Sequence, residues 1–330
     1  MAILITGGTG FIGAELARIL VDRGEDVVLF DIALNQARLK GIEDKVKLVQ
    51  GNLAYSSEVF NVVKDYNIEG IYHLGGMLSI PSNANPWASF QVNVCGTMFV
   101  LEAARLFNVQ RVVFASTLGT YGLNTSSVIT DETIQRPTIM YGIGKLYCEL
   151  LGMFYKNRFG LDFRSVRYPS VIGPGVKTPG VAQYNAWMIE NAALGKPYEC
   201  FVTEDTRCPV MYFKDAAICI EMLYQAPKER IKTVNYNVAG VTPIQTAKEL
   251  ELAIKKYIPD FQATYNPDPQ VMEFYRNFNV EIYDDSKAQE EWGWQPKYSN
   301  FEVVVLLRRF GIIPRDMVCK VFVLRIIGKF

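Results

Sequence analysis

Histidine is almost missing from the 330 residues, and the cysteines never come as a C-x-x-C pair. The single histidine, His73, leaves no basis for a histidine-rich metal site and argues against a Ser-His-Asp mechanism. The six cysteines are scattered, so we expect free, packed thiols, as in a cytoplasmic chain, and no metal. They are Cys95, Cys148, Cys200, Cys208, Cys219 and Cys319.

An excess of charge and long apolar runs are also missing. Thirty-four basic residues balance 34 acidic ones, so no overall field attracts nucleic acid or an anionic membrane. No apolar run approaches the ~18 residues of a membrane span. The first residues read as a strand with no basic segment before them, which predicts no secretory signal. We therefore expect a cytoplasmic protein with a small-molecule partner.

Short runs rich in Val, Ile and Leu alternate with helical stretches over residues 1–115. Apolar strands that alternate with helices predict a parallel sheet covered on both faces, the doubly wound α/β (Rossmann) class. The expected strands are 2–6, 26–31, 46–50, 71–74 and 111–116, and the expected helices 14–22, 59–66 and 89–107.

The segment "ILITGGTGFIG" places glycines between a strand and a helix. Gly7, Gly10 and Gly13 allow a tight turn and a close approach of backbone N–H groups to a pyrophosphate, at a helix N-terminus. Eighteen residues after Gly13, Asp31 ends the next strand, where a carboxylate accepts hydrogen bonds from a ribose and repels a 2′-phosphate. The pattern predicts NAD as the cofactor.

The amino-acid composition changes after Arg167. The stretch "YPSVIGPGVKTPGV" is rich in Gly and Pro and predicts irregular structure, followed by a helix at 184–193, a strand at 209–212 and a helix at 215–224. We expect an NAD-binding part over residues 1–170, to which segments near 209–240 return. Residues 171–330 are then mainly a smaller C-terminal substrate-binding lobe and a tail.

Six motifs follow one another in an order typical of one family. They are "TGGTGFIG", "HLGG" (73–76), "VNVCGT" (92–97), "STLGTYG" (116–122), "YGIGK" (141–145) and "RYPSVIGP" (167–174). Over roughly residues 1–300 the sequence resembles the extended short-chain dehydrogenase/reductases, which include NAD-dependent sugar epimerases and dehydratases.

The resemblance implies a catalytic Tyr141, Lys145 and Thr117. A phenol with a pKa near 10 is a poor base at neutral pH. The ammonium of Lys145 one turn away, with the positive nicotinamide ring, is expected to lower the pKa of Tyr141. Lys145 is also expected to hold the nicotinamide ribose, and Thr117 to bind the substrate oxygen.

The same resemblance implies further cofactor contacts. Beyond the glycines and Asp31, these are Phe11, Ile12, Asn52, Leu53, Leu74, Gly75, Gly76, Asn93 and Tyr168. Asn93 is otherwise an ordinary helix residue, and His73 is interpreted as structural. Ser79 either contacts the substrate or the nicotinamide, or is a plain loop serine.

The stretches "RPTIMYGIGK", "DTRCPVMYFKDA" and "YDDSKAQEEWGW" resemble the short-chain type of L-threonine 3-dehydrogenase within this family. Two segments differ from that type: Val181 and Ala182 in "GVAQYNA" replace hydroxyl-bearing residues, and Asn279 replaces a tryptophan. Lost polar partners weaken recognition of a charged substrate. We predict NAD-dependent oxidation of a small, polar, threonine-like secondary alcohol, or the reverse ketone reduction, and leave the substrate open.

The alternative is a nucleotide-sugar epimerase or dehydratase. Cys208 stands where an arginine of such enzymes grips a diphosphate, and Arg207 is one position away, either a substrate ligand or a surface ion pair. A non-catalytic NAD-binding regulator is a third possibility, against which the complete Tyr, Lys and Thr set argues. The resemblance also implies a homodimer. The apolar, basic tail 317–330 is expected to dock on its own domain, a partner or a membrane surface.

Overall fold

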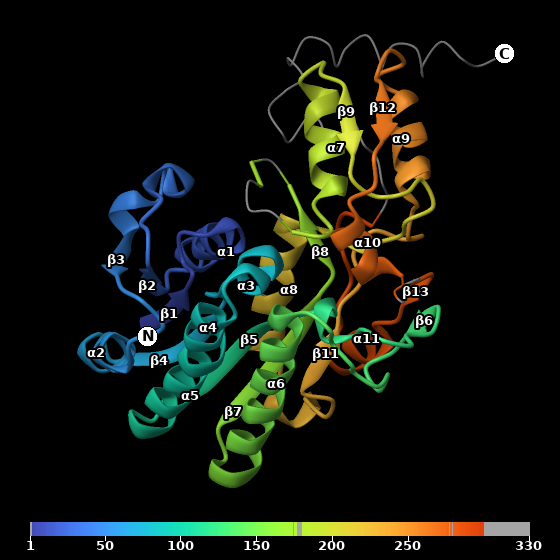
Figure 1. Cartoon of the computed structure of the whole chain (residues 1–330). Coiled ribbons are helices and arrows are strands. Elements are labelled where there is room, and N and C mark those ends of the chain that lie inside the picture. Colours follow the sequence, from blue (N-terminus) through green and yellow to red (C-terminus); the bar gives the residue numbers. More distant parts are fainter. Residues whose placement is uncertain (1, 174, 177–179, 277, 279, 300–330) are drawn as a thin grey trace, which may run out of the picture.

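A seven-stranded parallel sheet forms the centre of the computed structural model, which describes residues 2–299 except 174, 177–179, 277 and 279 (Figure 1). The strands lie in the order β11-β7-β5-β4-β1-β2-β3. Their bounds are β1 Ala2–Thr6, β2 Asp26–Asp31, β3 Val46–Gln50, β4 Ile68–His73, β5 Arg111–Thr117, β7 Asp162–Tyr168 and β11 Asn235–Asn237. The first five agree with the predicted strands to within three residues at either end.

Two helical layers cover the sheet because alternate strand residues point to opposite faces. Ile3 and Ile5 of β1 pack into one core with the helices α1 (Phe11–Asp22) and α8 (Phe213–Gln225). Leu4 packs into a second core. Helices α2 (Ser56–Asp65), α5 (Gly96–Leu106) and α6 (Met140–Phe159) cover that face. This arrangement confirms the doubly wound α/β class.

The strand order reverses at β1. From β1 the chain runs outward to β2 and β3, then crosses back to β4, on the other side of β1, and continues to β5. Neighbouring connections therefore leave the carboxyl ends of β1 and β4 in opposite directions and open a crevice between them, where ligands of such sheets bind.

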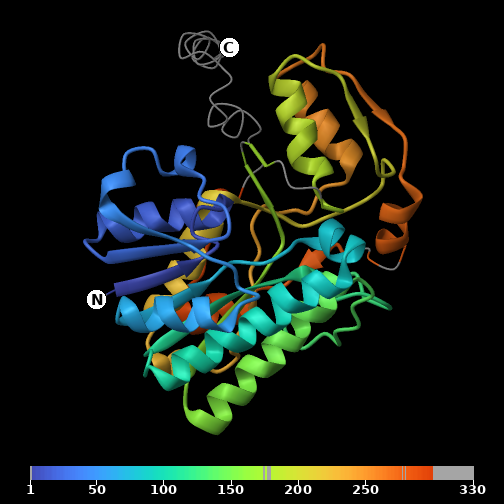
Figure 2. The ribbon, with the colours of Figure 1, turned by 60° about the vertical axis from the view of Figure 1, so that its left-hand side comes forward.

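The helix predicted at 89–107 is longer than expected and is not uniform. It begins with α4 (Pro86–Ser89), passes through a π-helical segment, η3 (Phe90–Cys95), and continues as α5. The side chain of Asn85 caps its start by accepting a hydrogen bond from the N–H of Ala88. The short helix α3 (Ser79–Ala84) precedes it, and Ser79 and Pro81 of this helix face the crevice. Figure 2 shows the ribbon from a second side.

A smaller group of elements lies beyond the carboxyl ends of the strands (Figures 1 and 2). It contains α7 (Tyr184–Ala193), α9 (Ala247–Lys255), α10 (Pro269–Tyr275) and the parallel pair β9 (Tyr198–Cys200) and β12 (Ala263–Tyr265), around an apolar core of its own. The helix predicted at 184–193 is confirmed.

One prediction in this region is wrong. The Gly- and Pro-rich stretch predicted to be irregular contains a strand, β8 (Ser170–Ile172), which pairs with β10 (Val210–Tyr212). Its partner lies 40 residues further along the chain, so a local reading of the stretch does not reveal it. The predicted strand at 209–212 and the helix at 215–224 correspond to β10 and α8.

The chain passes between the two groups of elements several times. Strand β11 pairs with β7 at the edge of the main sheet, and α8 packs with α1. Helix α11 (Ser286–Trp292) packs into the same core, and β13 (Ile282–Tyr283) pairs with β6 (Val128–Ile129). The short 3-10 segments are η1 Gln36–Leu39, η2 Glu43–Lys45, η4 Leu118–Thr120 and η5 Lys228–Arg230.

Among the described residues, none of the helices combines the length and the apolar composition that crossing a bilayer takes. The tail 317–330 and the tryptophan replacement at Asn279 lie outside these residues.

Candidate active site

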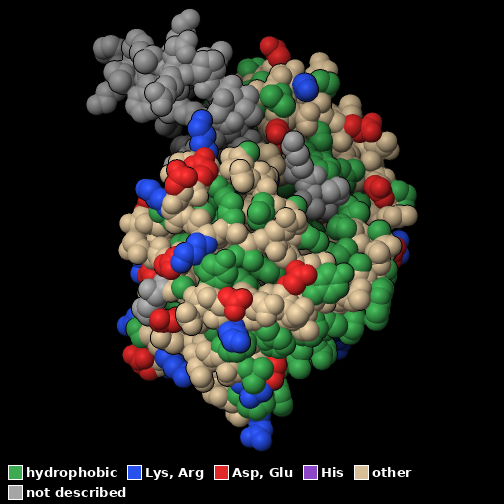
Figure 3. All heavy atoms as spheres, turned by 90° about the vertical axis from the view of Figure 1, so that its left-hand side faces the viewer, with side chains coloured by type: hydrophobic (Ala, Val, Ile, Leu, Met, Phe, Trp, Pro, Cys, Tyr) green, Lys and Arg blue, Asp and Glu red, His purple; other side chains and the backbone are tan. Residues whose placement is uncertain are grey.

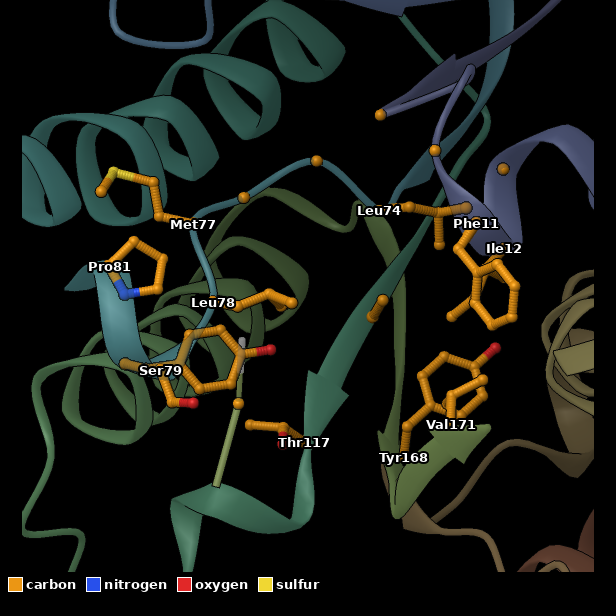
Figure 4. Close-up of a pocket in the computed structure, with 18 of the residues that line it drawn as sticks. Phe11, Ile12, Leu74, Met77, Leu78, Ser79, Pro81, Thr117, Tyr168 and Val171 are labelled. Carbon is orange, nitrogen blue, oxygen red and sulfur yellow. The ribbon is translucent and has the colours of Figure 1, made fainter. Parts of the chain in front are cut away.

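A pocket of about 790 Å³ occupies the crevice at the carboxyl ends of β1, β4 and β5. Figure 4 shows its two ends, with Phe11, Ile12 and Tyr168 at one side and Ser79 and Thr117 at the other. Eighteen of the sequence-predicted site residues line it: Gly7, Gly10, Phe11, Ile12, Gly13, Asp31, Asn52, Leu53, Leu74, Gly75, Gly76, Ser79, Thr117, Tyr141, Lys145, Tyr168, Val181 and Ala182.

The glycine turn is closed to side chains. Gly7 has a φ of +66°, which strains any other residue. A Cβ on Gly13 would lie 2.3 Å from the carbonyl oxygen of Gly7, and one on Gly10 would lie 2.9 Å from that atom. The N–H of Gly10 donates to this oxygen at 3.0 Å, and α1 starts directly after it. The turn thus offers bare backbone and a helix N-terminus, as a pyrophosphate requires.

The carboxylate of Asp31 is held at the same end of the pocket. Its Oδ2 accepts hydrogen bonds from the N–H and the hydroxyl of Thr9, at 3.1 and 2.9 Å. Arg38 also lines this end, with its guanidinium over the ring of Phe11 and a hydrogen bond to the carbonyl of Gly175 at 3.3 Å. Sequence reasoning missed Thr9 and Arg38, although Thr9 stands inside the glycine motif.

Two predicted residues lie behind the pocket wall. Asn93 does not line the pocket; its side chain bonds both the N–H and the carbonyl of Met77, at 2.8 and 3.0 Å, and so fixes a wall segment. His73 lies between the hydroxyls of Thr6 and Thr97. Burial, and then the charge of Lys145, lower the pKa of His73 to about 3, so this ring is neutral and structural.

Thr117 and Tyr141 bring two hydroxyls to the other end of the pocket. Thr117 ends β5, and Tyr141 stands in the first turn of α6, where a Cβ on Gly142 would lie 2.0 Å from the carbonyl oxygen of Gly119. Burial raises the pKa of Tyr141 to about 12, and a hydrogen bond with Thr117 partly offsets that effect. The phenol is therefore protonated at neutral pH in the protein by itself.

The ammonium of Lys145 is hydrogen-bonded to a backbone carbonyl. Its Nζ donates to the carbonyl of Ala115 at 2.8 Å and lies 5.8 Å from the ring centre of Tyr141. Burial lowers the pKa of Lys145 to about 8. The expected lowering of the pKa of Tyr141 by Lys145 is not found here, because burial raises that pKa and the effect that partly offsets burial is the hydrogen bond with Thr117.

A buried ion pair fixes the next turn of α6. Arg167 of β7 holds the carboxylate of Glu149 through Nη2 at 2.8 Å and through Nε. The hydroxyl of Ser116, next to Thr117, also donates to Glu149. Removing one partner of such a pair leaves a buried charge, which costs about 3–5 kcal/mol. Helix α6, β5 and β7 are thereby held together at the site.

A further part of the pocket wall is mostly apolar. Val181, Ala182, Cys208 and Phe274 line it, and burial raises the pKa of the Cys208 thiol to about 12. Among the described residues that line the whole pocket, the charged side chains are those of Asp31, Arg38 and Lys145. Phe274 comes from α10, far along the chain, and no local sequence signal marks it.

Arg207 does not reach the pocket. Its guanidinium donates to the carbonyl of Ile244 at 2.6 Å and pairs with the exposed carboxylate of Glu249 at 3.3 Å. The proposed contact of Arg207 with a substrate anion therefore has no geometric support, and the surface ion pair describes the residue. In the described part of the chain, no three His, Cys, Asp or Glu side chains gather as metal ligands would.

A glycine turn at the start of α1, a carboxylate at the end of β2 and a Tyr/Lys pair line one crevice, as in a dinucleotide-dependent short-chain dehydrogenase/reductase. The family model described as "NAD dependent epimerase/dehydratase family" matches residues 3–239, and the chain belongs to this family. Its cofactor is NAD.

Particular relatives are L-threonine dehydrogenases. The chain is 31% identical to the mitochondrial L-threonine 3-dehydrogenase of Bos taurus, over 93% of this chain and 82% of that protein. The solved GalE-like L-threonine dehydrogenase from Cupriavidus necator (holo form) is 31% identical with a TM-score of 0.84, covering 93% and 99% of the two chains. The L-threonine dehydrogenase from Phytophthora infestans is 32% identical with a TM-score of 0.83, covering 98% and 99%.

Proposed function

We propose that the protein oxidises a small polar secondary alcohol to a ketone with NAD, or catalyses the reverse reduction, and that L-threonine is its first candidate substrate. The single observation that carries the proposal is the pair of hydroxyls of Tyr141 and Thr117, which are half-buried and hydrogen-bonded to each other in the pocket that begins at the glycine turn. The L-threonine dehydrogenases among its relatives support the choice of substrate.

In this proposal Tyr141 takes the proton of the substrate hydroxyl as general base, and returns it in the reverse direction. Thr117 binds the same substrate oxygen and orients it. Lys145, buried with its ammonium on the Ala115 carbonyl, places a positive charge near the phenol ring and would bind the nicotinamide ribose. Bound NAD supplies the hydride acceptor and a positive ring that favours the phenolate.

The remaining cofactor contacts follow from the glycine turn and the carboxylate at the end of β2. The bare backbone of Gly7, Gly10 and Gly13 would take the pyrophosphate, and Asp31 the adenosine ribose. Residues 1–170 with the returning segments would hold NAD. The elements around α7, α9 and α10 would hold the substrate.

The test is NADH formation over a panel of threonine, other 3-hydroxy amino acids, hydroxy acids and simple alcohols. Threonine, or a close analogue, should produce NADH in proportion to enzyme. If no secondary alcohol on the panel reduced NAD, while NADH still bound tightly, the proposed activity would be wrong.

A nucleotide-sugar epimerase is the weaker candidate. Such an enzyme would need a cation for the diphosphate, and the position in question holds Cys208, whose thiol is buried and neutral. The guanidinium of Arg207 forms an ion pair with the carboxylate of Glu249. Net production of free NADH from the substrate would separate the two functions, since epimerisation returns the hydride within one turnover.

We also propose a homodimer. Ile143, Tyr147, Leu150 and Phe154 form an exposed apolar stripe along α6, spaced three and four residues apart. Figure 3 shows hydrophobic side chains gathered over the middle and lower right of one face. Leu150→Asp should yield a monomer in sedimentation, whereas Ile134→Asp, at an exposed position outside the stripe, should not. Equal masses for both variants would contradict the assignment.

The cytoplasm is the compartment we propose. The five cysteines within the described residues are all free, and four of them are buried, which suits a reducing compartment. The Bos taurus relative is named as mitochondrial, so fractionation of cells that express the protein is the direct test.

A further inference from the structure

Asn52 lines the end of the pocket that holds the carboxylate of Asp31. It follows Gly51, whose N–H donates to the carbonyl of Asp31 at 2.9 Å. Asp31 itself pairs with Gln50, the last residue of β3. Asn52 therefore lies at the neighbouring strand end, next to the residue that suits the adenosine ribose and on the side away from β1.

The order of the strands indicates which part of the cofactor reaches Asn52. The strands run β1-β2-β3 from the middle of the sheet to its edge. The glycine turn after β1 suits the pyrophosphate, and Asp31 at the end of β2 suits the ribose. The base is attached to the ribose on the side away from the pyrophosphate, so it extends past Asp31 toward the end of β3. Ile32 and Leu53 line the pocket there with apolar surface that can contact the faces of a purine.

Most polar groups of Asn52 are already engaged within the protein. Its N–H donates to Oε2 of Glu58 at 2.7 Å, and its carbonyl accepts from the N–H of Tyr55 at 3.1 Å. Its side-chain oxygen, Oδ1, accepts from the N–H of Ala54 at 2.9 Å, as in an Asx turn. Because an N–H needs an acceptor, this last bond fixes which atom of the amide is the oxygen.

The group that remains is the amide nitrogen of Asn52. Within the described part of the chain, Nδ2 donates to no other group, and the residue is half-buried in the pocket wall. With Oδ1 turned onto the backbone N–H of Ala54, Asn52 offers the pocket a hydrogen-bond donor. A carboxylate in the same place would offer the opposite, since an ionised carboxylate only accepts.

A donor at this position suits two kinds of purine. Along one edge, adenine carries an acceptor, N7, beside the amino group N6, which donates. A 6-oxopurine such as hypoxanthine carries two acceptors there, N7 and O6. The amide nitrogen of Asn52 can therefore donate to either base, whereas a carboxylate could accept only from the amino group of adenine.

We propose that Asn52 recognises the purine of the cofactor as a hydrogen-bond donor, so that the protein also binds a nicotinamide dinucleotide with a 6-oxopurine base. The proposal concerns cofactor binding and does not depend on the proposed alcohol oxidation. It makes residue 52 the position at which an amide, in place of a carboxylate, removes the requirement for an amino group on the base.

Two variants and two ligands test the assignment by titration, with nicotinamide fluorescence as the signal. The ligands are NADH and reduced nicotinamide hypoxanthine dinucleotide, and the unaltered protein should bind the second with a Kd no more than a few fold above that of NADH. Asn52→Asp keeps an acceptor for the N–H of Ala54 and should raise the Kd of the hypoxanthine dinucleotide at least about tenfold relative to that of NADH. Asn35→Asp adds the same charge to another residue that lines the pocket and should leave the ratio of the two Kd values unchanged.

Binding of NADH verifies that Asn52→Asp is folded. The same ratio of Kd values in Asn52→Asp and Asn35→Asp would overturn the assignment, and so would a preference of more than a few fold for NADH in the unaltered protein. Loss of both dinucleotides in Asn52→Asp would overturn it as well, because the amino group of adenine should compensate for the lost donor. If the unaltered protein oxidised no alcohol, the proposed function would be wrong, whereas these binding ratios would still decide the role of Asn52.

Discussion

The two ends of the pocket are built in different ways. The cofactor end uses backbone: three glycines exclude side chains from a turn, and a single carboxylate, oriented by Thr9, stands nearby. The substrate end uses side chains from segments far apart in the sequence, including Ser79, Thr117 and Phe274. The first end suits a dinucleotide and does not depend on the substrate. The second is free to change with the substrate.

The most severe change should be the loss of the Tyr141 hydroxyl. Tyr141→Phe should lower kcat for oxidation by about 10²–10⁴-fold, because the general base is removed, while NADH binding stays within a few fold. The matched control is Tyr257→Phe, an exposed tyrosine outside both the pocket and the apolar stripe of α6. Comparable activity of the two variants in a stopped-flow assay would show that Tyr141 is not the general base and that the substrate does not react at this end of the pocket.

The pH dependence follows from the same hydroxyl. Oxidation needs the phenolate, and burial raises the pKa of Tyr141 to about 12, so the phenolate fraction rises about tenfold per pH unit below the pKa. We expect kcat/KM for oxidation to rise from pH 7 to pH 8 and to rise less steeply above the pKa of Lys145, about 8, where that ammonium loses its proton. Ketone reduction needs the phenol and should not rise. A flat oxidation profile between pH 7 and 8 would contradict this role.

Glycine substitutions should separate the two ends. Gly13→Ala forces a Cβ to 2.3 Å from the Gly7 carbonyl and should raise the Kd for NADH at least about tenfold, for a strain of 1–3 kcal/mol. Gly180→Ala meets its neighbours only at 3.4 Å or more and should leave that Kd unchanged while raising the KM of the substrate. Isothermal titration with NADH measures the first effect. A similar loss of NADH affinity in both variants would erase the distinction.

The smallest effect should come from restoring hydroxyls to the apolar wall. Val181→Thr with Ala182→Thr should improve kcat/KM for threonine by a few fold to about tenfold, since each hydroxyl adds a partner for a charged substituent. Turnover of an alcohol without charged groups should fall or stay level in the same variant. An improvement for both substrates would show that the hydroxyls act on the fold and not on recognition.

The sequence was a good guide where structure is local. The glycine turn, Asp31 and the first five strands are short-range patterns in which period and turn chemistry carry the information. The sequence was a poor guide where partners are remote: β8 depends on β10, and β6 on β13. Phe274 reaches the pocket only through packing, and Arg207 is turned away by Glu249.

The ion pair between Arg167 and Glu149 has a consequence for the order in which the protein folds during synthesis. The hydroxyl of Tyr283 donates to the backbone carbonyl of Arg167 at 2.8 Å, so the strand that steadies the Tyr141 helix is itself fastened by residues translated more than a hundred codons later. In a nascent chain the glycine turn should therefore fold early, whereas the helix that carries Tyr141 should be held in place only when synthesis is nearly complete. Ribosome-bound chains halted before Ile282 should consequently be cut by protease in α6, while finished chains should resist.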